Sequence, residues 1–211
     1  MRPHAGQPIR QAGMPIEHAK AAVVLFHDRA STAEDIIDLW EEFDNPEVAY
    51  LAPQAAGNAW FPKSCLAAYA ENEPHLSSAL WLVSKVLEAL GDSGLPPEQV
   101  MLAGFSQGAC LVLEYVARTP RRYGGVAAFS GGLLGPQGRL RSYRGSLDAT
   151  PVFLGCSDID FHVPKTRVLE TAEVLRGMGA EVTERIYPGM PHTLNEDELA
   201  EAQQMLEELV I

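Results

Sequence analysis

Short apolar runs alternate with longer amphipathic stretches along most of the chain. The short runs are rich in valine, leucine and alanine, and a continuous apolar run bounded by polar residues is typical of a strand that is buried on both faces. The pattern predicts six strands, at residues 21–26, 48–52, 100–105, 126–129, 152–154 and 182–187.

The stretches between these strands carry apolar residues at intervals of three and four, which is the period of an amphipathic helix. They predict helices at residues 33–42, 76–90, 107–118, 165–178 and 196–209. Gly91, Gly124 and Gly179 are expected to mark the ends of elements. The segment 131–150, which is rich in glycine and polar residues, is predicted to be a surface excursion.

Strands and helices alternate in sequence, which predicts an α/β fold with a mostly parallel central sheet and helices on both faces. The chain has 211 residues, of which 46% are hydrophobic. A chain of this size and composition is expected to form one domain over residues 1–211.

Acidic residues outnumber basic ones by 28 to 16, which gives a formal net charge of −12. Such a surface repels phosphate groups, so neither a nucleic-acid partner nor stable membrane association is expected. No apolar run approaches the roughly 20 residues that span a bilayer, and residues 1–13 lack the apolar core of a secretory signal. We therefore expect a cytoplasmic protein, with a homodimer left open. The three cysteines have no C-x-x-C spacing and are expected to be reduced thiols.

Residues 104–108 read Gly-Phe-Ser-Gln-Gly, which fits G-x-S-x-G between a predicted strand and a predicted helix. In that context the serine occupies a sharp, strained turn that exposes its hydroxyl, and the glycines let the chain approach itself closely. Ser106 is therefore the predicted nucleophile. The backbone N–H of Gln107, at the start of the helix, is a predicted oxyanion donor, and a second donor is expected from the loop 27–30.

A serine hydroxyl needs a base to take its proton and a carboxylate to orient that base. His192 lies in a loop rich in proline and glycine between the last predicted strand and the last helix, and it is the candidate base. The carboxylate is Asp158 or Asp160, since both follow the strand 152–154 at the edge where α/β ligand sites form. The residues alone favour Asp160 without excluding Asp158.

The same segment allows two other interpretations. Asp158, Asp160 and His162 alternate and could share one face as a metal site, although strand geometry is not expected to continue into the loop. Cys156 is an alternative nucleophile, but it lacks a strand-to-helix turn and is expected to be a buried thiol. No chemical role is assigned to the other histidines, which are the surface candidates His4, His18 and His75 and the loop residue His27.

From about Ala21 onward, the sequence resembles the phospholipase/carboxylesterase family of α/β-hydrolases, which includes bacterial carboxylesterases and eukaryotic acyl-protein thioesterases. The resemblance rests on Leu51-Ala52-Pro53-Gln54 with Trp60-Phe61-Pro62, on Gly104-Phe105-Ser106-Gln107-Gly108-Ala109, on Phe129-Ser130-Gly131-Gly132, on residues 155–164 and on Tyr187-Pro188-Gly189-Met190-Pro191-His192.

The resemblance implies an α/β-hydrolase fold with no lid domain, and a serine esterase that needs no cofactor and no metal. It places the family's catalytic triad on Ser106, Asp160 and His192, because the family's aspartate stands four residues before the proline that is Pro164 here. It implies small-molecule carboxylic esters of short to medium acyl chain as substrates, with lysophospholipase or acyl-thioesterase activity as the nearest alternative.

The resemblance also places the oxyanion donors on the backbone of Gln107 and Arg29, and it makes Trp60 a wall of the acyl pocket. The loop 27–30 nevertheless reads His-Asp-Arg-Ala, where the family usually has glycines. Asp28 and Ala30 resist a positive φ, so a different path of this loop is expected, with a negative charge near the oxyanion. The altered loop supports a hypothesis from another class, in which the protein binds a ligand without turnover.

Overall fold

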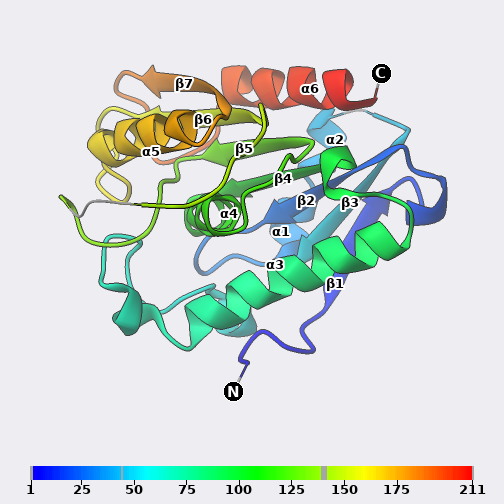
Figure 1. Cartoon of the computed structure of the whole chain (residues 1–211), viewed down its shortest axis with the longest axis horizontal. Helices are drawn as coiled ribbons and strands as arrows, with labels where there is room; N and C mark the ends of the chain where they lie inside the picture. Colours follow the sequence, from blue (N-terminus) through cyan, green and yellow to red (C-terminus); the bar gives the residue numbers. More distant parts are fainter. Residues whose placement is uncertain (1, 44, 139–141, 211) are drawn as a thin grey trace.

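The structure is a computed structural model that describes residues 2–43, 45–138 and 142–210. In this part of the chain, seven strands form one sheet in the order β1-β3-β2-β4-β5-β6-β7 (Figure 1). β1 pairs with β3 in antiparallel orientation, and all other pairings are parallel. The strands are β1 (Ile9–Gly13), β2 (Ala21–Phe26), β3 (Val48–Pro53), β4 (Val100–Phe105), β5 (Gly125–Phe129), β6 (Pro151–Ser157) and β7 (Glu181–Tyr187).

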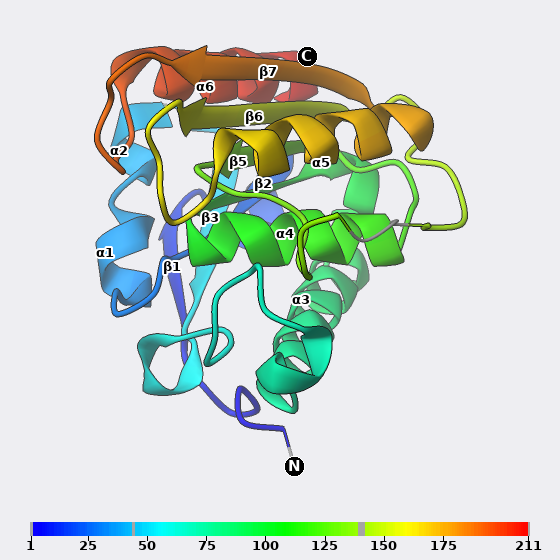
Figure 2. The same ribbon diagram turned by 90° about the vertical axis from the view of Figure 1, so that its left-hand side faces the viewer.

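Helices cover both faces of this sheet. They are α1 (Ala33–Ile37), α2 (Trp40–Phe43), α3 (His75–Asp92), α4 (Gln107–Arg118), α5 (Lys165–Gly177) and α6 (Glu196–Val210). In Figure 2, α4 and α5 lie in front of the sheet and α6 lies behind β7. The predicted α/β fold is confirmed.

The central strand β2 shows why helices are needed on both sides. All its residues are buried, and successive side chains of a strand point to opposite faces. Its even-numbered residues belong to the hydrophobic cluster under α3, α4 and α5, and its odd-numbered residues belong to the cluster under α1, α2 and α6. A continuous apolar run therefore forms a strand here because each face of the sheet is covered.

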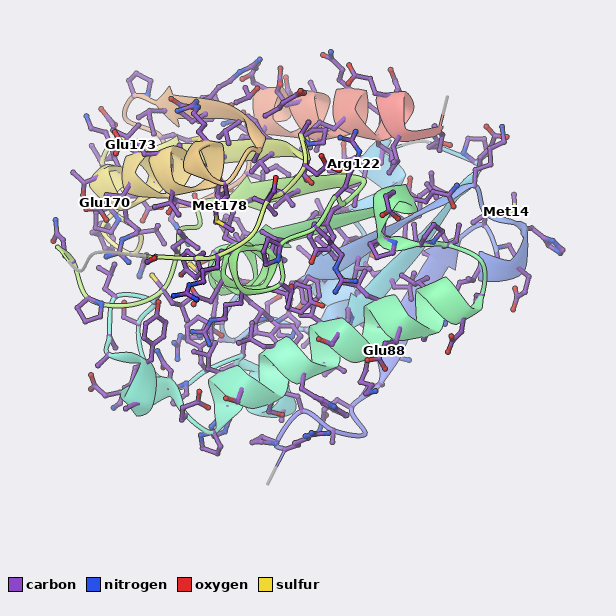
Figure 3. All side chains as sticks on the ribbon, in the orientation of Figure 1. Met14, Glu88, Arg122, Glu170, Glu173 and Met178 are labelled. Atoms are coloured by element: carbon purple, nitrogen blue, oxygen red, sulfur yellow. The ribbon has the colours of Figure 1, made fainter. Side chains whose placement is uncertain are left out.

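The outer sides of the helices are charged. Glu88 on α3 and Glu173 on α5 are exposed and project away from the sheet in Figure 3. Among the described residues, no helix combines the length and the apolar character needed to cross a membrane.

The six predicted strands correspond to β2 through β7, whereas β1 was not predicted. Its sequence, Ile-Arg-Gln-Ala-Gly, has no apolar alternation because the strand lies at the edge of the sheet and is mostly exposed. The helix predicted at 33–42 is interrupted between α1 and α2. There the N–H groups of Leu39 and Glu42 bond to carbonyls three residues earlier, so the tighter turn breaks the α-helical pattern.

Two predictions based on glycine are wrong. Gly91 lies inside α3, and the left-handed residue after that helix is Gly94, with φ 95°. The segment 131–150 is only partly a surface excursion, because Leu133 and Leu134 are buried; residues 139–141 lie outside the described residues. The backbone N–H groups of these two leucines bond to Thr171 Oγ1 and Glu114 Oε2, which makes burial of this strip favourable.

Gly108 sets how closely α4 approaches β2. A Cβ atom on Gly108 would lie 2.0 Å from the carbonyl oxygen of Phe26 and 2.7 Å from that of His27. These neighbours are backbone atoms in the sheet and the loop after it, so they have little freedom to move away. The first turn of α4 can lie against the end of β2 only because residue 108 has no side chain.

We expect Gly108→Ala to lower the free energy of unfolding by about 1–3 kcal/mol, because the added methyl forces α4 away from β2. Gly91→Ala is the matched control, since that glycine is helical and has nothing within 4 Å of its Cβ position. It should raise the free energy of unfolding by about 0.5–1 kcal/mol. Urea unfolding measures both. A Gly108→Ala protein at least as stable as wild type would contradict the close packing.

Candidate active site

The three predicted catalytic residues follow the carboxyl ends of parallel strands, so they meet at one edge of the sheet. Ser106 joins β4 to α4, Asp160 follows β6 and His192 follows β7. Residues up to 86 positions apart in sequence are thereby brought into contact.

Ser106 occupies a strained turn. Its φ of 53° and ψ of −111° lie outside the regions that side chains ordinarily allow. A Cβ atom on Gly104 would lie 2.6 Å from the carbonyl carbon of Gly108, so the turn needs a glycine there. The Ser106 N–H donates to the Phe129 carbonyl at 2.8 Å, which fixes the turn to β5. The turn therefore holds the serine hydroxyl at the N-terminal end of α4.

A continuous chain of hydrogen bonds joins the three residues. His192 Nε2 lies 2.9 Å from Ser106 Oγ, and His192 Nδ1 lies 2.6 Å from Asp160 Oδ2. With a proton on Nδ1, the imidazole donates to the carboxylate and offers Nε2 as an acceptor to the serine hydroxyl.

The structure separates the two aspartates that the sequence left open. Asp160 contacts His192, and its other oxygen accepts the backbone N–H groups of His162 and Val163 at 2.8 and 2.9 Å. Asp158 instead accepts the backbone N–H of Gly189 at 2.7 Å, which ties the loop that carries His192 to the end of β6. Asp158 therefore contacts the loop, and Asp160 contacts the imidazole.

Asp160 remains ionised although its side chain is fully buried. Burial acts to raise the pKa of this carboxyl, but the hydrogen bonds from the Val163 N–H, from His192 and from the His162 N–H outweigh it and hold the pKa below its ordinary value. A charged acceptor thus faces His192 Nδ1 at neutral pH, where it can stabilise a positive imidazolium.

Two rings hold the His192 imidazole in place. The ring centroids of Phe105 and His162 each lie 4.9 Å from that of His192. His162 is therefore a neighbour of the His192 imidazole. Among the residues that the structure describes, no cluster of three or more histidine, cysteine or acidic side chains is arranged to hold a metal ion.

A pocket of about 500 Å³ opens in front of Ser106. This volume falls within the usual range for small-molecule sites. Ser106, Gln107 and His192 are among its lining residues. Its other lining residues, most of them without a predicted role, are Asp28, Arg29, Phe61, Pro62, Lys63, Ser64, Cys65, Cys110, His162 and Val163. Most of these lie on loops far from Ser106 in sequence; only Cys110, one helical turn beyond Ser106, could have been found from spacing.

The loop 27–30 was expected to avoid the left-handed conformation, but it adopts that conformation at Ala30. Ala30 adopts φ 69°, and its N–H bonds to the Asn58 carbonyl at 2.8 Å. His27 is fully buried; its Nε2 accepts the Ala55 N–H at 3.0 Å, so Nδ1 carries the proton and donates to the Asp28 carbonyl. These bonds compensate for the strain that a glycine would have avoided.

Arg29 and Gln107 both border the pocket, and their side chains are bound to backbone groups of residues 60–63. The Arg29 guanidinium donates to the carbonyls of Phe61, Pro62 and Lys63, so it fixes the neighbouring wall to this loop. The Gln107 side chain accepts the Trp60 N–H and donates to the Phe61 carbonyl. Their backbone N–H groups take no part in these side-chain bonds.

Trp60 does not form the pocket wall that was predicted. It is fully buried behind the wall, where its indole N–H donates to the His27 carbonyl at 2.7 Å. Phe61 lines the pocket instead. His4 also differs from expectation, because it is buried and its ring bonds to the Trp60 carbonyl and the Ala56 N–H. Both rings can lie inward because each of these ring nitrogens has a hydrogen-bond partner there.

Glu198 is another buried carboxyl, behind the loop that carries His192. Its Oε2 accepts the Asn195 N–H at 3.0 Å, three residues from His192, and its Oε1 lies against Gly155 with no hydrogen-bond partner among the described residues. Burial raises the pKa of Glu198 to about 7, although the bond from the Asn195 backbone acts in the opposite direction.

Because the pKa of Glu198 is about 7 in the folded protein against an ordinary 4.5, the folded protein keeps a proton that the unfolded chain releases between these values. As the pH rises from about 4.5 to above 7, the wild type must ionise a buried carboxyl, which Glu198→Gln does not have. We therefore expect the free energy of unfolding of the wild type to fall by up to about 3 kcal/mol relative to that of Glu198→Gln. Urea unfolding across pH measures the difference. Glu196→Gln, which removes an exposed carboxylate from the same turn, is the control; parallel curves for Glu198→Gln and wild type would contradict the burial.

The chain is similar to known proteins over nearly its whole length. A sequence model of the family described as phospholipase/carboxylesterase matches residues 13–210. A crystal structure of a phospholipase/carboxylesterase from Dyadobacter fermentans is 44% identical, covers 96% of this chain and 97% of its own, and superposes with a TM-score of 0.91. Esterase PE8 is 28% identical, covers 96% of this chain and 98% of its own, and has a TM-score of 0.77.

Acyl-protein thioesterase 1 of Saccharomyces cerevisiae is 32% identical over 121 residues, which are 56% of this chain and 52% of the yeast protein. The chain thus matches about half the length of this curated relative. The family match extends over nearly all of the sequence, including the loops of Ser106, Asp160 and His192. The protein therefore belongs to the phospholipase/carboxylesterase family of α/β-hydrolases.

Proposed function

We propose that the protein is a carboxylesterase that cleaves small-molecule esters through a covalent acyl-enzyme, with Ser106 as nucleophile, His192 as base and Asp160 as the orienting carboxylate. The observation that carries the proposal is the unbroken hydrogen-bond chain from Ser106 Oγ through both nitrogens of His192 to Asp160. Family membership supports hydrolase chemistry in general.

Acylation uses this chain directly. As Ser106 Oγ attacks the ester carbonyl carbon, its proton moves to His192 Nε2, and the buried carboxylate of Asp160 stabilises the imidazolium. The imidazolium then protonates the leaving alcohol oxygen, and the carbon–oxygen bond of the ester breaks. Water next attacks the acyl-serine and gives one proton to His192. The acyl–oxygen bond then breaks, the acid leaves, and His192 returns the proton to Ser106 Oγ. No step requires a metal or cofactor.

The tetrahedral oxyanion needs two donors. Gln107 is the first residue of α4, so its N–H has no partner within the helix, and the positive end of the helix dipole lies beside it. The backbone N–H of Arg29 is the proposed second donor, since Arg29 borders the same pocket and its side chain is anchored elsewhere. Typical oxyanion donors each contribute about 3–4 kcal/mol to lowering the barrier.

Thioesters are the second proposed substrate class. Yeast and Gibberella zeae proteins named acyl-protein thioesterase 1 match this chain at 32% and 35% identity. Oxyesters and thioesters pass through the same acyl-enzyme, so the hydrogen-bond chain accepts either. Measuring kcat/KM on an oxyester and on a thioester with the same acyl group shows which substrate class the protein prefers.

We expect Asp160→Asn to lower kcat on p-nitrophenyl butyrate by about three to four orders of magnitude, because an amide cannot stabilise the imidazolium and can hold the wrong tautomer. Ser106→Ala sets the background rate. Asp158→Asn is the matched control: it removes the same charge two residues away, from a group that contacts only the loop, and its loss should be far smaller. Exchanged phenotypes of the two asparagine variants would refute the assignment of Asp160.

The pocket favours short and medium acyl chains, because it must hold both the acyl group and the alcohol within about 500 Å³. We expect kcat/KM on p-nitrophenyl palmitate to be lower than on the butyrate by about tenfold or more. Assays of the ester series in one detergent concentration test this. A maximum at palmitate would show that long chains find a site other than this pocket.

A further inference from the structure

Two of the three cysteines, Cys65 and Cys110, line the same pocket as Ser106. Cys110 lies on α4 one turn after the serine, and its N–H donates to the Ser106 carbonyl at 3.0 Å. Cys65 lies on the loop that continues from Phe61, and the residues between them also line the pocket. Neither thiol has a part in the proposed hydrolysis.

A single segment of chain contacts both cysteines. The Gly132 N–H donates to Cys110 Sγ at 3.4 Å, and the Gly135 N–H donates to the Cys65 carbonyl at 2.7 Å. Arg167 holds this segment by donating to the carbonyls of Leu133 and Gly135 at 2.6 and 2.8 Å. The loop of Cys65 and the helix of Cys110 are thus joined through one segment beside the pocket.

The two thiols differ in acidity. The neighbouring Cys110 thiol is the main cause that lowers the pKa of Cys65 to about 7; burial opposes the shift, and the Arg167 guanidinium adds to it. The Cys65 thiol and burial raise the pKa of Cys110 well above its ordinary value. Cys65 is therefore the more readily ionised thiol of the pair, and Cys110 is the one that holds its proton more strongly. A thiolate that faces a pocket and has a second thiol beside it is the usual arrangement of an oxidation-sensitive site.

We propose that Cys65 and Cys110 are an oxidisable dithiol, which a hydroperoxide converts to a disulfide that reshapes the pocket beside Ser106. The site is defined by two thiols that line one cavity, one on α4 and one on the loop after Phe61, beside a segment that Arg167 anchors.

The chemistry is balanced with hydrogen peroxide as the oxidant. The Cys65 thiolate attacks one peroxide oxygen, the oxygen–oxygen bond breaks, and the products are a sulfenic acid and a hydroxide that takes a proton to become water. Cys110 then attacks the Cys65 sulfur, the sulfur–oxygen bond breaks, and a second water leaves. The two sulfurs lose two electrons in total, and the peroxide gains them.

The disulfide must move Cys65 rather than Cys110. Cys110 is buried within α4, whereas Cys65 lies outside the helices and strands. Closing the sulfurs to a bond of about 2.0 Å draws the loop toward α4, and a displacement of about 1 Å near reacting groups lowers turnover substantially. The same loop includes Phe61 to Lys63, whose carbonyls are bonded to Arg29, so the movement also reaches the proposed oxyanion loop.

Cys156 provides a control within the chain. It is also buried, but it lies at the end of β6, where its Sγ is 3.5 Å from the Val163 carbonyl and 3.9 Å from Asp160 Oδ2. Burial and the negative Asp160 raise the pKa of Cys156 to about 12. It does not line the pocket in front of Ser106, so it should resist the same oxidant.

The test treats the full chain with hydrogen peroxide and counts free thiols after denaturation, with peptide mapping of the cross-link. The expected count falls from three to one in wild type, with a Cys65–Cys110 disulfide that dithiothreitol reverses. Cys156→Ser should form the same disulfide, whereas Cys65→Ser and Cys110→Ser should not form it. A disulfide that includes Cys156, or none between Cys65 and Cys110, would overturn the proposal, and this readout does not depend on the proposed esterase activity.

The activity measurement rests on the proposed function and compares each protein with its own reduced form. Oxidised wild type should lose kcat/KM on p-nitrophenyl butyrate by about tenfold or more and recover it with dithiothreitol. Oxidised Cys65→Ser should keep the activity of its reduced form. A cross-linked wild type with unchanged kcat/KM would overturn the claim that the disulfide reshapes the pocket, even with the esterase intact.

Discussion

The strained turn at Ser106 is the constraint on which the rest of the site depends. A non-glycine residue holds φ 53° between a buried strand and a buried helix, at a cost of about 1–3 kcal/mol that the surroundings must offset. Gly104 and Gly108 leave room for the chain to cross itself there, and the Phe129 carbonyl takes the Ser106 N–H. The turn aims the hydroxyl outward at the sheet edge and starts α4 at Gln107, so one local conformation provides both the proposed nucleophile and an oxyanion donor.

Asp160 and His192 are positioned by two loops that hydrogen bonds join to each other. Asp160 is fixed by two backbone N–H groups of its own loop and meets His192 on the next loop. Asp158 and Glu198 each hold that second loop through a backbone N–H, from opposite ends of it. A buried charge is stable in this arrangement because every oxygen of Asp160 has a donor. The His192 imidazole, the proposed base, is therefore oriented before any substrate arrives.

The sequence was sufficient wherever a local pattern determined the structure. The strand β2 is a continuous apolar run, and the G-x-S-x-G motif requires a strand before it and a helix after it, so both could be placed. β1 could not be found, because an edge strand with exposed residues has no apolar period. Ala30 at φ 69° and Trp60 behind the wall were also missed, since each depends on hydrogen bonds to residues more than 25 positions away. The shared pocket of Cys65 and Cys110 is of the same kind, and no spacing in the sequence reveals it.

The central claim is that Ser106 is a nucleophile activated by His192, and covalent capture tests it most directly. A fluorophosphonate reacts with an activated serine hydroxyl and leaves a stable adduct that mass spectrometry can map. The account predicts a single adduct on Ser106 in wild type, none in Ser106→Ala, and much slower labelling in His192→Ala. No adduct in the folded wild-type protein, or an adduct on a residue other than Ser106, would contradict it and favour a binding protein of the same fold.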